Sequence, residues 1–162
     1  MILVTLGTHP KPMDRLMVVI ERLIESGEIT EPVIIQSASY GVRPKGADLH
    51  QLVSVTRLHE WASTASIIIT HGGPASITLA MSVGRRPIVV PRDPRFHEHV
   101  DNHQILFTRW LAQRRPIIAV EDPATDLGAA LLEASVAAKT TGVGAADPRA
   151  IERLRRIIEG DR

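Results

Sequence analysis

The chain has 162 residues, the length of one ordinary domain, and its composition of 44% hydrophobic and 23% charged residues excludes a disordered protein. A formal net charge of +1, with two Trp, one Tyr and two Phe, argues against a broad nucleic-acid-binding surface. The lack of cysteine excludes disulfides, thiolate nucleophiles and cysteine-ligated metals. No apolar run approaches the roughly 20 residues that cross a bilayer. We expect a cytoplasmic protein that meets a membrane only peripherally.

Short apolar runs alternate with helical patterns along the chain. The runs predict six strands, at Ile2–Leu6, Pro32–Gln36, Leu52–Val55, Ser66–Thr70, Pro87–Val90 and Pro116–Val120. The patterns between them predict helices at Met13–Ser26, near Leu58–Thr64, and at Ala75–Val83, Val100–Ala112 and Asp126–Ala138. Such alternation is typical of a parallel sheet covered on both faces. We therefore predict an α/β fold, a three-layer Rossmann-like sheet of about six parallel strands, over residues 1–138.

Residues 139–162 are predicted to be an appendage to that domain. Lys139–Asp147 has the composition of a flexible linker, and Pro148–Glu159 has the spacing of an amphipathic helix. The apolar stripe of this helix would pack either on the chain's own core or on a partner.

The segment Ile67–Ser76 is the most informative in the sequence. A β-branched run, typical of a buried strand, is followed closely by Gly72 and Gly73. Pro74 comes next and suits the first position of a helix. The free amides of a helix N-terminus attract phosphate, glycines allow an anion to come close, and Ser76 could donate a further hydrogen bond. The pattern favours a diphosphate site, although glycines at such a turn can also serve only to reverse the chain.

Two common nucleotide motifs are missing. There is no Gly-x-Gly-x-x-Gly after the first strand and no Gly-x4-Gly-Lys-Ser/Thr anywhere, which argues against hydride transfer and NTP hydrolysis. Right-handed crossovers would place the loops at Gly7–Thr8, after Val55, at His71 and after Val90 around one cleft.

A second polar cluster follows the strand at Pro87–Val90. Asp101, Asn102, His103 and Gln104 crowd the predicted first turn of a helix, and mixed donors and acceptors of this kind suit sugar hydroxyls. Asp101 and Asn102 could instead be simple helix caps.

A metal site is the rival explanation for the histidines of this segment. His99 and His103 are four residues apart, with His97 nearby, but the sequence His-Glu-His-Val-Asp is not the His-Glu-x-x-His of zinc proteases. We expect no metal. Arg92 and Arg95 could add positive potential, but we expect both to lie on a solvated loop.

Together these motifs resemble the C-terminal, donor-binding half of glycosyltransferase family 28. The chain is similar to the short stand-alone members of bacterial exopolysaccharide synthesis, and to the catalytic subunit of the eukaryotic two-subunit transferase that adds N-acetylglucosamine to a lipid-linked sugar. The segments that carry the resemblance are Val4–Thr8, Pro12–Leu16, Thr70–Ser76, Gly84–Arg92 and Glu98–Gln104.

The resemblance implies the C-terminal half of a GT-B fold that binds a UDP-sugar without a metal cofactor. It assigns His71 to catalysis and the diphosphate to Gly7, Thr8, Gly72, Gly73, Pro74 and Ser76. The uracil would border a loop that includes Val55, Arg57 and Leu58, and the sugar would contact Asn102, His103 and Gln104. One departure is Leu79, because related transferases often have a glutamate there that holds the ribose.

The chemistry of sugar transfer also needs a general base near the acceptor. His9 and His99 are candidates for this role. The chain is too short for the acceptor-binding half of a full GT-B enzyme, so we expect a separate, membrane-attached subunit to present a polyprenyl-linked acceptor. The alternative is a non-catalytic subunit that binds a sugar nucleotide or only supports a complex.

Overall fold

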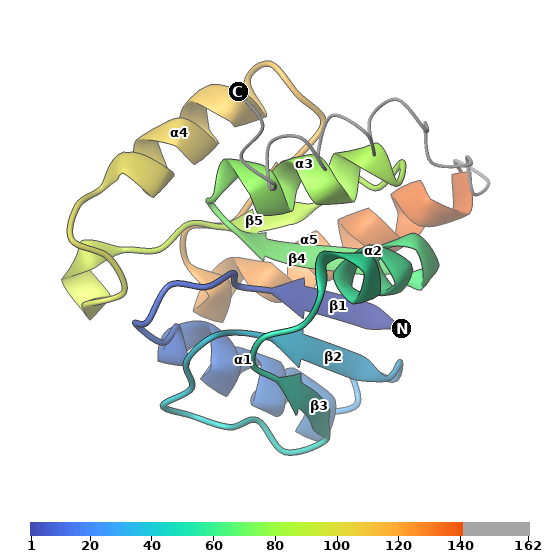
Figure 1. Ribbon diagram of the computed structural model, residues 1–162. Coiled ribbons are helices and arrows are strands. Elements are labelled where there is room, and N and C mark those ends of the chain that lie inside the picture. The colour runs from blue at the N-terminus through green and yellow to red at the C-terminus, as the bar shows by residue number, and fades with distance from the viewer. Residues whose placement is uncertain (141–162) are drawn as a thin grey trace.

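The computed structural model describes residues 1–140, which form a six-stranded sheet between two layers of helices (Figure 1). The strands are β1 (Ile2–Thr5), β2 (Val33–Gln36), β3 (Ala47–His50), β4 (Ile67–His71), β5 (Ile88–Val90) and β6 (Ile118–Ala119). Their order is β3-β2-β1-β4-β5-β6, and every neighbouring pair is parallel. The predicted Rossmann-like fold is confirmed.

The helices divide between the two faces of the sheet. They are α1 (Asp14–Glu25), α2 (Val55–Thr64), α3 (Pro74–Ser82), α4 (His103–Ala112) and α5 (Pro123–Thr140), with a 3₁₀ turn, η1, at Pro94–Phe96. Alternate strand residues point to opposite faces, so Val4 and Ile69 pack with α1 and α5 while Leu3 and Ile68 pack with α2 and α3. Because both faces are covered, the central strands are apolar on both faces until their last residues, which is why the sequence showed them as continuous runs.

The sheet has its topological switch point between β1 and β4. β1 leads into α1 on one face and β4 leads into α3 on the other, so the two connections diverge beyond the ends of adjacent strands. Ligands of open α/β sheets bind in the crevice that such divergence opens. The loops after β1, β4 and β5 meet at this edge, opposite the N-terminus in Figure 1.

One predicted strand is wrong, and the helix predicted after it is present but begins earlier. The third strand is Ala47–His50 and not Leu52–Val55, and Val55 begins α2. Ser54 determines that start, because its hydroxyl accepts the main-chain N–H of Arg57 at 3.1 Å. β3 is the edge strand and only partly buried, so its sequence is too polar to have been recognised as a strand.

Two helices also differ from their predicted bounds. α4 begins at His103, three residues later than predicted, and Asn102 is its N-cap. α5 runs to Thr140 and so includes the first two residues that were predicted as linker. The rest of that linker and the predicted helix Pro148–Glu159 lie outside the described residues. Up to residue 140, no helix is both long and apolar enough to span a membrane.

Candidate functional site

The turn from β4 to α3 has the predicted strand–glycine–helix form. β4 ends at His71, Gly73 is the N-cap in an extended conformation, and Pro74 is the first helical residue. Within the described residues, no side chain caps this helix. The positive end of the α3 dipole therefore meets no anionic side chain of that part of the chain.

The His71 ring lies across this turn and is held from both sides. Nδ1 is 3.1 Å from the main-chain nitrogen of Gly73, and Nε2 is 3.2 Å from Oγ of Ser76. An amide can only donate, so Nδ1 accepts and the ring proton is on Nε2, which donates to Ser76. Gln104 Oε1 is 3.4 Å from Nδ1, but this oxygen can only accept, and it already accepts the Arg92 N–H. The Ser76 hydroxyl thus keeps its own proton to donate to a ligand.

The glycines of the site have a packing role that the sequence did not reveal. A Cβ on Gly73 would overlap Cε1 of His71, and one on Gly7, which has φ of +70°, would lie 2.9 Å from Nε2 of the same ring. A Cβ on Gly72 would lie 2.9 Å from Cβ of Gln104 on α4. In this structure, Gly7 and Gly73 therefore make room for the His71 ring, and Gly72 makes room for α4.

His71 is neutral at physiological pH. Burial is the main cause that lowers its pKa from 6.5 to about 4, and the positive charge of Arg92 is the next. A neutral imidazole at this point orients Ser76 without adding charge of its own.

Arg92 corrects one prediction. It does not lie on a solvated loop: its side chain is fully buried, and it donates to the carbonyl oxygens of Lys11 at 2.6 Å and Leu6 at 3.1 Å. Its main-chain N–H also donates to Oε1 of Gln104 at 3.1 Å. Arg95, by contrast, is exposed as predicted and forms an ion pair with Asp93 at 2.6 Å. The sequence contained one signal for the difference, because Arg92 follows a buried strand by only two residues.

A buried ion pair fixes the rest of the loop after β5. The Glu98 carboxylate, which is 2% exposed, accepts Nε of Arg15 and the N–H of Asp93, both at 2.9 Å. Arg15, from α1, also donates to the carbonyls of Pro91 at 2.6 Å and Glu121 at 2.7 Å. Burial raises the pKa of Glu98 and the Arg15 charge opposes that rise. The loop is therefore held by side chains from a distant helix.

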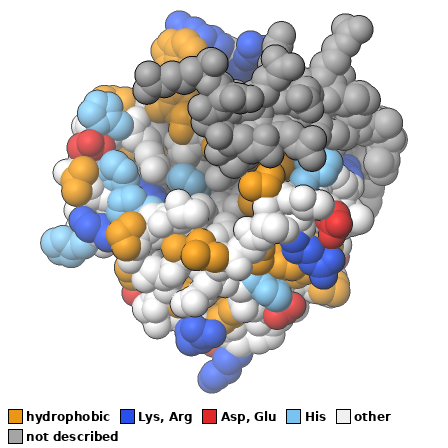
Figure 2. Space-filling model, in the orientation of Figure 1, with side chains coloured by type: hydrophobic (Ala, Val, Ile, Leu, Met, Phe, Trp, Pro, Cys, Tyr) orange, Lys and Arg blue, Asp and Glu red, His pale blue; other side chains and the backbone are white. Residues whose placement is uncertain are grey.

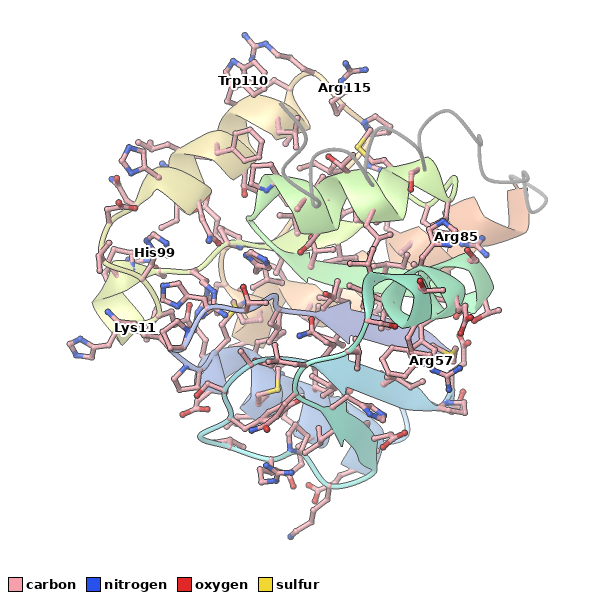
Figure 3. All side chains as sticks on the ribbon, viewed as in Figure 1. Lys11, Arg57, Arg85, His99, Trp110 and Arg115 are labelled. Atoms are coloured by element: carbon pink, nitrogen blue, oxygen red, sulfur yellow. The ribbon has the colours of Figure 1, made fainter. Side chains whose placement is uncertain are left out.

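Two histidines proposed as bases lie together at the rim of the crevice. The rings of His9 and His99 are stacked with centroids 5.1 Å apart, and Nζ of Lys11 is 3.4 Å from the His99 carbonyl (Figure 3). Burial, followed by the charge of Arg92, lowers the pKa of His9. Figure 2 shows histidine and cationic side chains gathered on this side of the molecule.

The predicted sugar-binding residues are brought to the same edge, but not as one helical turn. Asp101 precedes α4, and its carboxylate accepts the N–H of His103 at 3.1 Å and contacts the rings of His99 at 3.1 Å and His103 at 2.9 Å. The contact with His103 is the main cause that lowers the Asp101 pKa. Asn102 makes no side-chain cap. Within residues 1–136, no three His, Asp or Glu side chains are grouped so that they could hold a metal ion.

The residues assigned to the uracil lie in the first turn of α2 and not in a loop. Val55 is half exposed, Leu58 packs toward the core, and Arg57 pairs with Glu60 at 3.1 Å (Figure 3). Leu79, on α3, is 7% exposed and belongs to the apolar cluster under α2. It is a core residue in this chain, which explains why a carboxylate is absent there.

Sequence reasoning missed Gln36 at the end of β2. Its amide donates to the carbonyls of Gly7 at 3.1 Å and Gln51 at 2.8 Å, and its oxygen accepts the Thr5 hydroxyl at 3.0 Å. A glutamine at the end of an apolar strand was the available signal.

Comparison with protein-family models decides the family. The model of the glycosyltransferase family 28 C-terminal domain matches residues 1–135. The chain belongs to this family. No curated protein matches the sequence significantly.

One solved structure supports the fold of this family 28 domain, and two others are similar to the chain. The glycosyltransferase SnogD from Streptomyces nogalater is 18% identical, with a TM-score of 0.51 over 95% of this chain and 42% of its own. MurG from Acinetobacter baumannii and the spinosyn forosaminyltransferase SpnP are 17% and 16% identical, each with a TM-score of 0.48 over 97% of this chain. They are covered over 49% and 43% of their own length, so the family 28 chain spans less than half of these structures.

Proposed function

We propose that this chain is the donor-binding part of a UDP-sugar-dependent glycosyltransferase. It transfers a hexose or an N-acetylhexosamine to a lipid-linked acceptor in polysaccharide synthesis. The observation that carries the proposal is the uncapped N-terminus of α3 at the switch point of the sheet, with His71 and Ser76 beside it, in a family 28 C-terminal domain.

The donor would lie along the carboxyl edge of the sheet. Its diphosphate meets the first turn of α3 and the Ser76 hydroxyl, with Gly7, Thr8, Gly72, Gly73 and Pro74 around it. The uracil borders Val55, Arg57 and Leu58 of α2, and the sugar reaches Asn102, His103 and Gln104.

The chemical task of this half is to stabilise the departing diphosphate. Preorganised amides and the α3 dipole act where negative charge develops and need no reorganisation during the reaction. Neutral His71 fixes the Ser76 oxygen, and Ser76 donates to a phosphate oxygen. These groups replace a divalent metal. His9 or His99 then takes the acceptor's proton, and the low pKa of His9 keeps that ring in the basic form at neutral pH.

The acceptor site would belong to a second protein. The 162 residues match 42% of the length of SnogD, so the match covers one part of that structure and not all of it. We propose a membrane-attached partner that presents a polyprenyl-linked acceptor at the cytoplasmic face, with this chain peripheral to the membrane through that partner.

A non-catalytic role is the second candidate, and Leu79 favours it. Its side chain is buried among apolar groups and cannot hold the ribose. A subunit that binds a sugar nucleotide weakly, or only supports a complex, would tolerate this change.

The proposal is tested first by titrating UDP and a panel of UDP-sugars into the full chain by calorimetry. We expect saturable binding of UDP, which His71→Ala weakens. His71→Ala and Gln104→Ala are then assayed for turnover with the protein encoded beside this one. Lost turnover supports catalysis, and unchanged turnover supports the non-catalytic role. No UDP binding by the unaltered chain refutes the donor-binding proposal and leaves only a subunit that supports a complex.

A further inference from the structure

Arg92 is a buried arginine whose guanidinium contacts no carboxylate of residues 1–136. Its side chain is 0% exposed, and its acceptors are the carbonyls of Leu6, Lys11 and Glu98, the last at 3.3 Å. Its Nε finds no hydrogen-bond partner in the described part of the chain. The Glu98 carboxylate is bound to Arg15 and to the main chain of Asp93 instead. The guanidinium is thus solvated mainly by main-chain dipoles. The Glu98 carboxylate stabilises its charge as well, but forms no ion pair with it.

The residue also joins the segments that surround the candidate site. Its side chain reaches the loop after β1 through Leu6 and Lys11, on either side of Gly7 and Thr8, and its own N–H holds Gln104 of α4. Its charge lowers the pKa of His71 and of His9, so the positive potential extends into the crevice.

Energetics argue for a ligand that uses this charge. Taking an arginine out of water costs several kcal/mol, and carbonyl contacts that leave one donor unpaired compensate only in part. An apolar residue would fill the same space at lower cost. An anion bound within reach of this buried charge would recover part of this energy.

We infer that Arg92 is a positioning residue that places a fixed positive charge beneath the donor diphosphate and holds the loop after β1 against the loop after β5. The inference rests on the proposed function for the identity of the anion. In this proposal, the fixed positive charge of the site comes from Arg92, which acts on the ligand without contacting it.

Arg15 offers a matched control, because it ties the same region together without the same electrostatic role. It bridges the carbonyls of Pro91 and Glu121, but its charge is paired with Glu98 and is not among those that shift the pKa of His71. If the role of Arg92 were purely structural, loss of Arg92 and loss of Arg15 would have the same effect on the His71 pKa and on UDP affinity.

The experiment compares Arg92→Lys, Arg92→Met, Arg15→Lys and Arg15→Met in the full chain. The His71 pKa is read from the imidazole nitrogen shifts by NMR, and UDP affinity by calorimetry. We expect Arg92→Met to raise the His71 pKa from about 4 toward 6.5 and to weaken UDP binding about tenfold. Arg92→Lys keeps the His71 pKa low and binds UDP more tightly than Arg92→Met. The Arg15 variants lower the unfolding temperature but leave the His71 pKa unchanged and UDP affinity within about twofold.

Two results would overturn the inference: an unchanged His71 pKa in Arg92→Met, or an Arg15→Met variant that weakens UDP binding as much as Arg92→Met. If Arg92→Met does not fold, Arg92→Lys tests the inference in its place. This variant keeps the positive charge, so a raised His71 pKa in it would contradict the inference. Failure of the unaltered chain to bind UDP refutes the proposed function and the identity of the anion. The His71 titration still decides whether the Arg92 charge reaches the site.

Discussion

The two segments that frame the crevice are built in opposite ways. The β4–α3 turn is a main-chain structure, in which glycines make room for one buried ring and a helix end is left uncapped. The loop after β5 is a side-chain structure, in which Arg92, Glu98 and Arg15 hold an irregular backbone from inside. The first presents amides to a ligand, and the second sets where the surrounding loops lie.

This contrast indicates how the work of one site can be divided. Backbone amides and a helix dipole tolerate little rearrangement, so changes at the turn should affect ligand binding more than stability. Buried charges are costly to separate, so changes in the loop should affect stability first. Each prediction below tests one side of this division.

The largest effect is expected from Arg15→Met. It removes the ion-pair partner of the Glu98 carboxylate, which is 2% exposed, and should lower the free energy of unfolding by about 3 kcal/mol. Urea unfolding measures this change. Arg57→Met is the control, since both partners of the Arg57–Glu60 pair are more than half exposed, and it should cost less than about 0.5 kcal/mol. An equal loss of unfolding free energy in the two variants would show that the Arg15–Glu98 pair stabilises the chain no more than an exposed ion pair does.

The pH dependence of stability should carry a contribution from His71. Its pKa is about 4 in the folded chain and 6.5 when unfolded, so the unfolded state binds the proton more tightly. Stability therefore falls as the pH drops below 6.5, and the loss is complete below about 4, at no more than roughly 3 kcal/mol. His71→Gln should remove this part of the slope when unfolding is measured from pH 7 to 4. Identical slopes for the two proteins would contradict a buried, neutral His71.

Gly73→Ala should separate binding from stability. The added Cβ overlaps the His71 ring, so the ring must rotate away from Ser76, and we expect UDP affinity to fall about tenfold. Gly128→Ala is the matched control, because its Cβ would meet only Oε2 of Glu28, at 3.4 Å, and it lies in a helix. That variant should leave UDP affinity unchanged and stabilise the chain slightly. A Gly73→Ala protein that binds UDP normally would show that the position of the ring does not matter.

The smallest effect is expected from Ser76→Ala. It removes one hydroxyl donor while His71 and the α3 amides stay in place, so UDP affinity should fall about fivefold with little change in unfolding temperature. Calorimetry and thermal unfolding measure the two quantities. A loss of stability larger than the loss of affinity would place Ser76 among the structural residues.

The sequence was sufficient for the centre of the fold and the turn, and less so for the edge and the loop. β1, β4 and β5 are apolar on both faces, and a strand that ends in glycines before Pro74 permits few other structures. The edge strand β3 is polar and short, so the sequence of Ala47–His50 has no alternation of apolar and polar residues that would distinguish it from a loop.

The loop after β5 could not be derived from local sequence. Glu98 is held by Arg15, 83 residues away, and Arg92 reaches the carbonyl of Leu6, 86 residues away. Such contacts depend on the tertiary fold, and the same residues on a surface loop would be solvated.

The most direct test of the account is a crystal structure of the chain with UDP bound. We predict that the diphosphate lies against the first turn of α3, with the Ser76 hydroxyl within hydrogen-bond distance of a phosphate oxygen and His71 still behind it. UDP bound away from the α3 N-terminus, or a His71 ring that fills the space the phosphates need, would contradict it.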